Sequence, residues 1–539
     1  MASERLQVSI LAGSFCLAAL LNACAGSDAA PSARGSDFDA TGGSNGNIGS
    51  STGGSAGPQG GGVNVPPPET ENEAQYLAPV ATGKFLWTAN PLSGRVALID
   101  ATTLAVTLTT AGDGPTEVVG LPELDGHFGA LVLNTRSDDA TLFRLGDDGI
   151  PVKSAPLHTH ADANSWVVSP SGAFAIAWTD ARKLEKPDRL QTFQDITLFV
   201  LTPGDEHVVP LSVGVRPSRF GFDTRESHLY AVSEEGISVV ELGDEPSVTG
   251  LLEVSENPLD DPTTRDVNFS PDGSYAVVRN DGHTSIGVIS LPGGALEKVD
   301  LGGVVTDIDL TPDGDRALAV LGPKSEVVLI PLPVAGADPA TFPRIQLGTE
   351  AIGSIALNAD ASQAAVYSTV LATTRVTLLG IGPGPTFTKK RTQDLISPVT
   401  ALFAAPDPRF AITFQGPASN SKKAGAFSLL SLEAQRVPKI VATDAAPAQI
   451  AFSPESDAAL VTVSSEKLAT FGAYLIALGN QQVDFVSLES PPLAAGVVPA
   501  AGRAYIAQSH PEGRITFVSL ATGELQSLTG FELAARIRQ

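Results

Sequence analysis

Cysteine and methionine are almost absent from this sequence, and their scarcity excludes several kinds of site. Cys16 and Cys24 are the only cysteines among 539 residues, and Met1 is the only methionine. The rest of the chain therefore cannot form an internal disulfide, a cysteine-ligated zinc or iron–sulfur site, a thiol nucleophile or a thioether metal site. We expect no cofactor, apart from the divalent metal ion considered below.

Aromatic and basic residues are also scarce. Aromatic residues make up 6% of the chain, with three tryptophans, which is poor for docking a quinone cofactor or a sugar. Lysine and arginine total 34 against 59 aspartates and glutamates, a net charge of −25 that disfavours a nucleic-acid partner. The sequence has no P-loop or HExxH motif, and it matches GxSxG only in the Gly/Ser-rich residues 42–57, so no GxSxG nucleophile elbow is present.

The first 23 residues have the pattern of an export signal, with Arg5 before an apolar stretch at 8–21. The tetrad Leu21-Asn22-Ala23-Cys24 resembles the lipobox of bacterial lipoproteins, although Asn22 is a less usual occupant of its position. The resemblance implies cleavage before Cys24 and a lipid on Cys24 as the membrane contact. The alternative is an ordinary secretory signal that is cut nearby.

Residues 24–75 are rich in Gly, Ser, Ala, Asn and Pro and have almost no large apolar side chain. Such a segment cannot bury a core, so we expect a flexible tether with a reach of roughly 35–45 Å. These two segments predict a protein that is lipid-anchored at the bacterial cell envelope, on the periplasmic face of the outer membrane or on the cell surface.

A strand cassette recurs about ten times in residues 76–539. Two apolar strands flank a turn such as Pro271-Asp272-Gly273, and a third strand follows, as in residues 95–100, 286–291 and 514–519. This period of roughly 40–52 residues predicts an all-β fold, a β-propeller of about ten four-stranded blades. The array could close as one large ring or as two smaller rings, and the lack of a linker within it favours one ring.

A family resemblance is visible in the first repeat. Residues 83–103, GKFLWTANPLSGRVALIDATT, resemble the YVTN-type propeller repeat of bacterial surface and periplasmic proteins. Later repeats keep the turn and lose the rest of the motif. The resemblance implies a propeller but no single activity, because such relatives include binding proteins, surface proteins and lactonase-like enzymes.

The candidate site lies in the polar loops that lead into the innermost strands of the third to sixth repeats. In a propeller these loops share one face with the loops between second and third strands, so residues 180–194 and 279–283 belong to the same face. The alternative is that these are solvated surface loops. The candidate ligand-binding residues are His158, His160, Asp162, Asn164, Arg216, Arg219, Asp261, Arg265 and Asp266.

Three of these candidates alternate along the chain. If residues 157–166 are extended, His158, His160 and Asp162 share one face and could hold a divalent metal ion with open positions. The alternative is that the loop histidines are satisfied by neighbouring backbone groups.

The favoured function is a binding or scaffold module for an envelope protein or a small molecule. The alternative is a lactonase-like or other hydrolase, with a pocket formed by His158, His160, Asp162, Arg216, Arg219 and Arg265. The Pro/Asp/Gly turns are interpreted as structural, on the face opposite the candidate site.

Overall fold

The structure is a computed structural model. It describes residues 77–124, 126–146, 148–184, 191–257, 260–384, 386–419, 421–433, 436–453, 458–531 and 536–537. The expected signal peptide, the tether, Cys16 and Cys24 lie outside these residues. Within the described part, no helix is long and apolar enough to cross a membrane.

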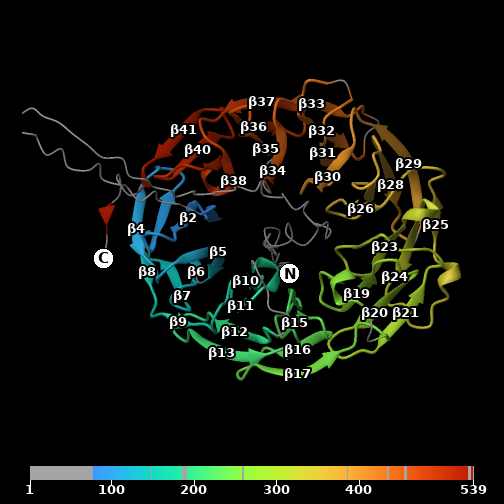
Figure 1. The fold of residues 1–539 in the computed structure, drawn as a ribbon, viewed down its shortest axis with the longest axis horizontal. Helices are drawn as coiled ribbons and strands as arrows, with labels where there is room; N and C mark the ends of the chain where they lie inside the picture. Colours follow the sequence, from blue (N-terminus) through green and yellow to red (C-terminus); the bar gives the residue numbers. More distant parts are fainter. Residues whose placement is uncertain are drawn as a thin grey trace, which may run out of the picture. The chain divides into compact units, whose positions relative to one another are not determined.

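Ten blades stand in one ring, each with four antiparallel strands, the first innermost and the fourth outermost (Figure 1). A short fifth strand is added to blade 1 by β42 (Arg536–Ile537) and to blade 2 by β9 (Leu157–His158). Blade 1 contains β1 (Val80–Thr82), β2 (Phe85–Asn90), β3 (Arg95–Asp100) and β4 (Val106–Thr110). Blade 2 contains β5 (Pro115–Leu124), β6 (His127–Asn134), β7 (Asp139–Leu145) and β8 (Pro151–Lys153), with β9 (Leu157–His158). Blade 3 contains β10 (Ser165–Val168), β11 (Phe174–Trp178), β12 (Asp195–Val200) and β13 (His207–Ser212). Blade 4 contains β14 (Arg219–Phe222), β15 (His228–Val232), β16 (Ile237–Glu241) and β17 (Ser247–Leu252). Blade 5 contains β18 (Arg265–Phe269), β19 (Tyr275–Asn280), β20 (Ser285–Ser290) and β21 (Leu296–Asp300).

The second half of the ring repeats this plan. Blade 6 contains β22 (Asp307–Leu310), β23 (Arg316–Leu321), β24 (Glu326–Pro331) and β25 (Arg344–Gln346). Blade 7 contains β26 (Ser354–Leu357), β27 (Gln363–Tyr367), β28 (Arg375–Ile381) and β29 (Phe387–Asp394). Blade 8 contains β30 (Val399–Ala404), β31 (Phe410–Gln415), β32 (Gly425–Ser431) and β33 (Lys439–Thr443). Blade 9 contains β34 (Ala446–Phe452), β35 (Ala458–Ser465), β36 (Thr470–Ala477) and β37 (Gln482–Ser487). Blade 10 contains β38 (Pro492–Val498), β39 (Arg503–Gln508), β40 (Arg514–Ser519) and β41 (Leu525–Thr529), and β42 (Arg536–Ile537) follows it.

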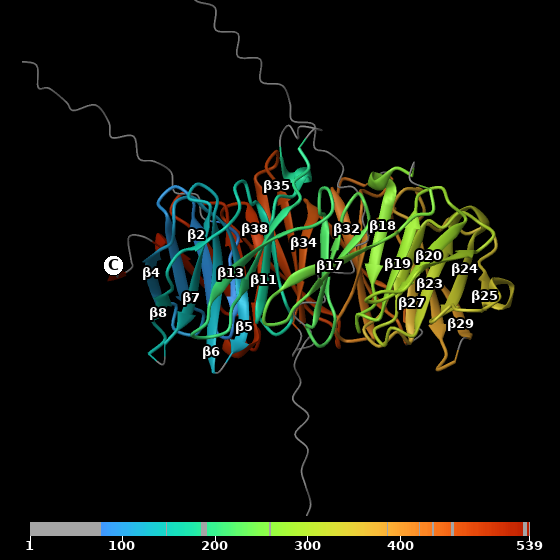
Figure 2. The same cartoon turned by 90° about the horizontal axis from the view of Figure 1, so that it is seen from below.

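Short 3-10 helices occupy some of the connections: η2 (Ala181–Lys183), η3 (Pro262–Thr264), η4 (Gly322–Lys324), η5 (Pro339–Thr341) and η6 (Pro499–Ala501). The predicted all-β propeller of ten four-stranded blades in a single ring is therefore confirmed. The ring is seen from the side in Figure 2.

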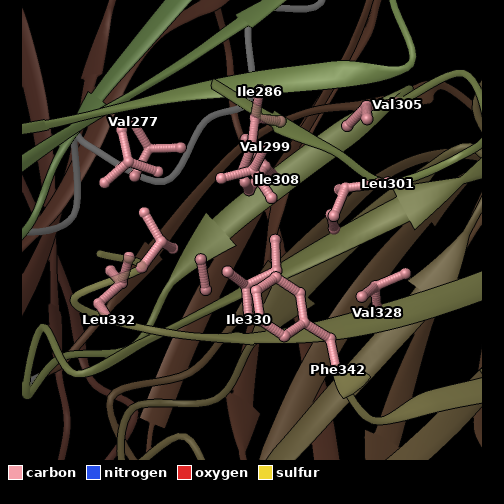
Figure 3. Close-up of a cluster of buried hydrophobic side chains, with 14 of the residues drawn as sticks. Val277, Ile286, Val299, Leu301, Val305, Ile308, Val328, Ile330, Leu332 and Phe342 are labelled. Carbon is pink, nitrogen blue, oxygen red and sulfur yellow. The ribbon is translucent and has the colours of Figure 1, made fainter. Parts of the chain in front are cut away.

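The core lies between adjacent blades. Each blade is covered on both faces, so its middle strands are continuous apolar runs; the side chains at 96–99 of β3, for example, are all buried. Figure 3 shows the cluster between blades 5 and 6, where Val277 and Ile286 meet Ile308, Ile330 and Phe342.

The last blade packs directly on the first. Leu86 and Ile99 of blade 1 share a core cluster with Tyr505 and Phe517 of blade 10. The Tyr505 hydroxyl donates to the Pro79 carbonyl oxygen at 3.2 Å. In addition, β42 pairs in parallel with β4, the outermost strand of blade 1. The first and last described segments of the chain thus meet at blade 1, which closes the ring.

The Pro/Asp/Gly turns have the predicted geometry. In the turn of blade 5, the Gly273 N–H donates to the Ser270 carbonyl at 2.8 Å, and Gly273 has φ of 72°. Asp272 Oδ1 accepts from the Ser270 hydroxyl at 2.6 Å, so the aspartate serves the turn itself. The comparable turn at 454–457 lies outside the described residues.

Candidate functional site

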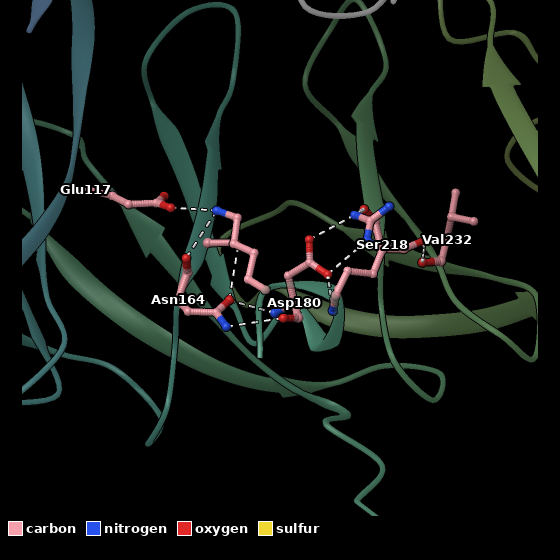
Figure 4. A network of polar contacts seen from close by, with 8 residues as sticks. Glu117, Asn164, Asp180, Ser218 and Val232 are labelled. Atoms are coloured by element: carbon pink, nitrogen blue, oxygen red, sulfur yellow. Dashed lines mark hydrogen bonds and ion pairs between the residues drawn. The ribbon is translucent and has the colours of Figure 1, made fainter. Parts of the chain in front are cut away.

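A chain of polar contacts joins the inner ends of blades 2, 3 and 4 (Figure 4). It is centred on η2, the helical turn that follows β11. Lys183 of η2 reaches toward blade 2, where its Nζ lies 2.5 Å from Glu117 Oε1 on β5. The same Nζ donates to the Asn164 carbonyl at 3.3 Å. Lys183 thus ties η2 to the innermost strand of the preceding blade.

Arg182 reaches the other way, toward blade 4. Its Nε and Nη2 each lie 2.9 Å from a carboxylate oxygen of Asp180, a fork that raises the pKa of Arg182. Its Nη2 also donates to the Ser218 carbonyl at 2.9 Å, just before β14. Asn164 holds Asp180 in place, because its side chain bonds both the N–H and the carbonyl of Asp180, at 2.8 and 3.2 Å.

A second cluster joins blades 4 and 5 around Glu234, in the loop between β15 and β16. Arg216 Nη1 donates to Glu234 Oε1 at 3.2 Å, and Arg265 Nη1 donates to the Glu234 carbonyl at 3.1 Å. Burial lowers the pKa of Arg265, and the nearby Asp260 opposes that shift. We call the two clusters together the channel rim: Glu117, Asn164, Asp180, Arg182, Lys183, Arg216, Ser218, Glu234 and Arg265.

The predicted metal ligands do not come together. His158 is exposed on β9, which pairs with β7 in register with Asp139, so it lies at the outer side of blade 2. The chain turns immediately afterwards, and Asp162 has φ of 62°, which breaks the alternation that a shared face required. Among the described residues, no group of three or more His, Cys, Asp or Glu side chains could hold a metal ion. The prediction that His158, His160 and Asp162 together hold a divalent metal ion is therefore wrong.

His160 is held by threonines. Its Nδ1 lies 2.9 Å from the hydroxyl of Thr197, and its Nε2 lies 3.3 Å from the hydroxyl of Thr179. Burial lowers the pKa of His160, against the attraction of nearby aspartates, so the ring is favoured in its neutral form. The ring of His160 is thus satisfied by side-chain hydroxyls and not by the neighbouring backbone groups that the alternative interpretation named.

The remaining candidates divide between local and inter-blade roles. Asp261 caps η3 by accepting from the Thr263 N–H at 2.9 Å. Arg219, the first residue of β14, donates from Nη1 to Asn268 Oδ1 on β18 at 2.9 Å and lies 3.6 Å from Asp266 Oδ1. The structure thus brings Arg219 to Asp266 and joins Arg216 to Arg265 through Glu234, whereas Asp261 serves as the cap of η3 and His160 is bonded by threonines.

Two carboxylates that the sequence analysis did not select as a pair bridge the innermost strands of blades 6 and 7. Asp307 Oδ2 accepts from the Ile355 N–H at 2.8 Å, and Asp309 Oδ2 accepts from the Leu357 N–H at 3.2 Å. Both N–H groups belong to β26, which pairs with β27 on its other side and with no other strand of the described residues. Asp307 and Asp309 are two positions apart on β22, and Ile355 and Leu357 are two positions apart on β26. The two carboxylates therefore match successive N–H groups on the open edge of β26.

These positions also shift the acidity of the pair. Burial raises the pKa of Asp307 to about 6. Burial first, and then repulsion by Asp307, raise the pKa of Asp309 to about 8. The acidic row continues to Asp266 on β18, which adds to both shifts. The signal in the sequence was the alternation Asp307-Ile308-Asp309, with one apolar residue between two carboxylates.

Asp309→Asn is expected to stabilise the protein at alkaline pH. The folded state holds the Asp309 proton more tightly than the unfolded chain, whose pKa is near 3.8, so the free energy of unfolding falls as pH rises from about 4 through about 8. Asparagine keeps the acceptor for Leu357 and removes this loss. Urea unfolding should show little difference at about pH 4 and a gain of about 1–3 kcal/mol at about pH 9. A variant no more stable than wild type at about pH 9 would contradict the assignment.

A Ser, His and Asp also meet in blade 4, at the turn between β14 and β15. Asp223 Oδ2 lies 2.9 Å from His228 Nδ1, and the Ser227 hydroxyl lies 3.1 Å from the same nitrogen. A hydrolase triad needs the serine at one ring nitrogen and the aspartate at the other. This arrangement therefore gives no support to the hydrolase alternative.

A shallow hollow of about 410 Å³ lies at blade 7, lined by residues 349–351 and 371–375. Its charged lining residues are already paired within the blade. Glu350 Oε1 lies 3.5 Å from Lys390 Nζ, and Arg375 Nε donates to Asp394 Oδ1 at 3.0 Å. The hollow therefore does not by itself indicate a site for a charged ligand.

No known protein family matches the chain, and no curated protein matches it. Hydrazine synthase of Kuenenia stuttgartiensis is 12% identical over 58% of this chain and 95% of its own, with a TM-score of 0.33. Dihydro-heme d1 dehydrogenase NirN in complex with DHE is 12% identical over 66% of this chain and 72% of its own, with a TM-score of 0.41. A eukaryotic initiation factor is 13% identical over 78% and 97%, with a TM-score of 0.47.

These likenesses carry no argument about function at such identities and scores. The YVTN-type resemblance of residues 83–103 stays a prediction, because no family match accompanies it.

Proposed function

We propose that the protein is a lipid-anchored propeller of the bacterial cell envelope that binds a protein partner through the channel rim. The observation that carries this proposal is the display of Arg182 and Lys183. Their side chains remain 68% and 48% exposed, although Arg182 is held by the Asp180 carboxylate and the Ser218 carbonyl and Lys183 by the Glu117 carboxylate and the Asn164 carbonyl. Arg182 thus contacts blade 4 through Ser218, and Lys183 contacts blade 2 through Glu117. Charged groups that are held in place lose little freedom on binding, which favours recognition of a complementary surface.

The rim fits a protein partner better than a small molecule. Its charged groups extend over four blades, from Glu117 of blade 2 to Arg265 of blade 5. Interfaces between proteins are broad and have polar margins, whereas small-molecule sites are concave and mostly apolar. In this proposal the partner binds at the channel rim. The lipid on Cys24 holds the protein to the membrane through the expected tether of residues 24–75.

The partner contact is tested by replacing both cations of η2. The measurement is chemical crosslinking in cells, which joins the protein to its envelope partner. In cells that carry Arg182→Ala with Lys183→Ala, we expect the yield of the most abundant crosslinked product to fall at least tenfold. The loss of exposed ion pairs should change the free energy of unfolding by only about 1 kcal/mol.

Arg409→Ala is the matched control, because Arg409 forms the same fork with Asp407 that Arg182 forms with Asp180, at the turn between β30 and β31. Its crosslinks should equal those of wild type. Equal loss in both variants, or no loss in the double variant, would refute the role of the rim.

The lipid anchor is tested separately. In Cys24→Ser we expect the protein to leave the membrane fraction and to lose labelling by a radioactive fatty acid, because the thiol that would carry the lipid is gone. Cys16→Ser, inside the expected signal, should keep both properties. Retention of the label in Cys24→Ser would exclude lipidation at this residue.

A further inference from the structure

The outermost strand of every blade presents an edge to solvent, and such edges invite pairing with another strand unless charged residues or proline blunt them. Seven of the ten outermost strands carry such residues. They are Pro151 and Lys153 in β8, Pro210 in β13, Lys298 in β21, Arg344 in β25, Lys390 in β29, Lys439 in β33 and Asp484 in β37. The other three, β4, β17 and β41, contain neither charge nor proline.

The molecule itself covers one of these three strands. β42 pairs in parallel with β4, with Thr107 opposite Arg536 and Leu108 opposite Ile537. The uncharged outer edge of β4 is thus extended by a strand of one basic residue, Arg536, and one apolar residue, Ile537. This leaves β17 and β41 without a further strand among the described residues.

β17 is the longer of the two and the more apolar at its surface. Five of its six residues are exposed, and the side chains of Val248 and Leu251 are 39% and 52% exposed. Acidic residues flank it at both ends: exposed Asp244 and Glu245 precede the strand, and exposed Glu253 follows it. The edge therefore combines an apolar centre with negative ends.

We propose that β17 binds an extended segment of a partner protein as a fifth strand of blade 4, and that this segment has apolar residues flanked by lysine or arginine. Backbone hydrogen bonds would hold the segment along the edge, Val248 and Leu251 would contact its apolar side chains, and the acidic flanks would pair with its cations. The inference rests on the proposed function, since it assigns a second partner surface and the chemistry that this surface recognises.

A second copy of this chain fits the edge poorly. Two β17 strands paired antiparallel about a twofold axis would place Asp244 and Glu245 of one copy beside Glu253 of the other. Like charges opposed across a strand pair are destabilising. Thr249, the extra residue of a bulge between Val248 and Gly250, also divides the edge into two short stretches, which suits a short segment better than a long ladder.

The test uses the full chain and two labelled peptides. One has an alternating Val/Thr centre flanked by arginines, and the other has the same centre flanked by glutamates. Fluorescence anisotropy should show saturable binding of the basic peptide and at least tenfold weaker binding of the acidic one. Leu251→Lys, which copies the protection of β21 by Lys298, should weaken binding of the basic peptide at least tenfold.

Leu525→Lys is the matched control, because it places the same charge on β41, whose Leu525 is 48% exposed. It should bind the basic peptide like wild type, and both variants should keep the wild-type Tm. Equal binding by Leu251→Lys and wild type, equal loss in both variants, or a dimer that only Leu251→Lys dissociates would overturn the proposal.

The outcomes also separate this inference from the proposed function. Loss of peptide binding to β17 with rim-dependent crosslinks intact would leave the proposed function standing. Loss of the rim-dependent crosslinks with peptide binding intact would refute the role of the rim and leave the binding of a basic segment by β17 standing.

Discussion

Replacement of Trp87 by alanine is expected to lower the free energy of unfolding by about 3–5 kcal/mol, the cost of deleting a large buried aromatic side chain. Trp87 lies on β2 with no exposed surface, and its ring stacks on Phe143 of blade 2 with centroids 5.8 Å apart. Its Nε1 donates to the Thr82 hydroxyl at 2.7 Å. Alanine would leave a cavity between blades 1 and 2 and a buried hydroxyl without that donor.

Trp87→Phe separates the two contributions. Phenylalanine keeps most of the ring volume and loses only the indole N–H, so we expect a loss of about 1–2 kcal/mol. Urea unfolding followed by circular dichroism measures both variants without relying on tryptophan fluorescence. A midpoint for Trp87→Ala within error of wild type would show that this interface does not limit the stability of the ring.

Gly273→Val is expected to lower the free energy of unfolding by about 2–5 kcal/mol, for two reasons. The left-handed backbone at φ of 72° costs an ordinary residue about 1–2 kcal/mol. In addition, a Cβ on Gly273 would lie 2.5 Å from the Cα of Asp223 in blade 4, and relieving such an overlap typically costs about 1–3 kcal/mol. The first cost follows from the turn sequence, whereas the second requires the neighbouring blade.

Gly282→Val is the matched control within the same blade. Gly282 has φ of 79°, but its Cβ would meet nothing within 4 Å. It should therefore show the backbone cost alone, and the difference between the two variants measures the contact between turns.

Partner crosslinks through the channel rim should survive in Gly273→Val molecules that still fold. Loss of crosslinking without a change in Tm would mean that the turn face is functional.

The repeats made the fold predictable. Each blade is built from strands and turns within about 45 residues, and apolar alternation with Pro, Asp and Gly at the turns specifies these elements locally. The turn at 270–273 forms as expected, with Asp272 bonded to Ser270 and Gly273 left-handed. The same local rules identified the loops around η2 as the face to examine.

The site was less predictable, because its members belong to different blades. The sequence pattern placed His158 on the channel side, but pairing with Asp139 places it on an outer strand. It selected Arg216 and Arg265, but not Glu234, which joins them. Glu117 and Lys183 are 66 residues apart and meet only because adjacent blades pack with a particular register and rotation.

The sequence by itself therefore determined the all-β class, the number of blades and the chemistry of the turns, because each depends on interactions between residues close in the chain. Only the tertiary structure decided the closure of the ring through blades 1 and 10, the pairing of β42 with β4, and the meeting of Asp307 and Asp309 with the open edge of β26. These contacts depend on how strands from separate repeats are brought into register. Side-chain packing between blades sets that register, and no local pattern encodes it.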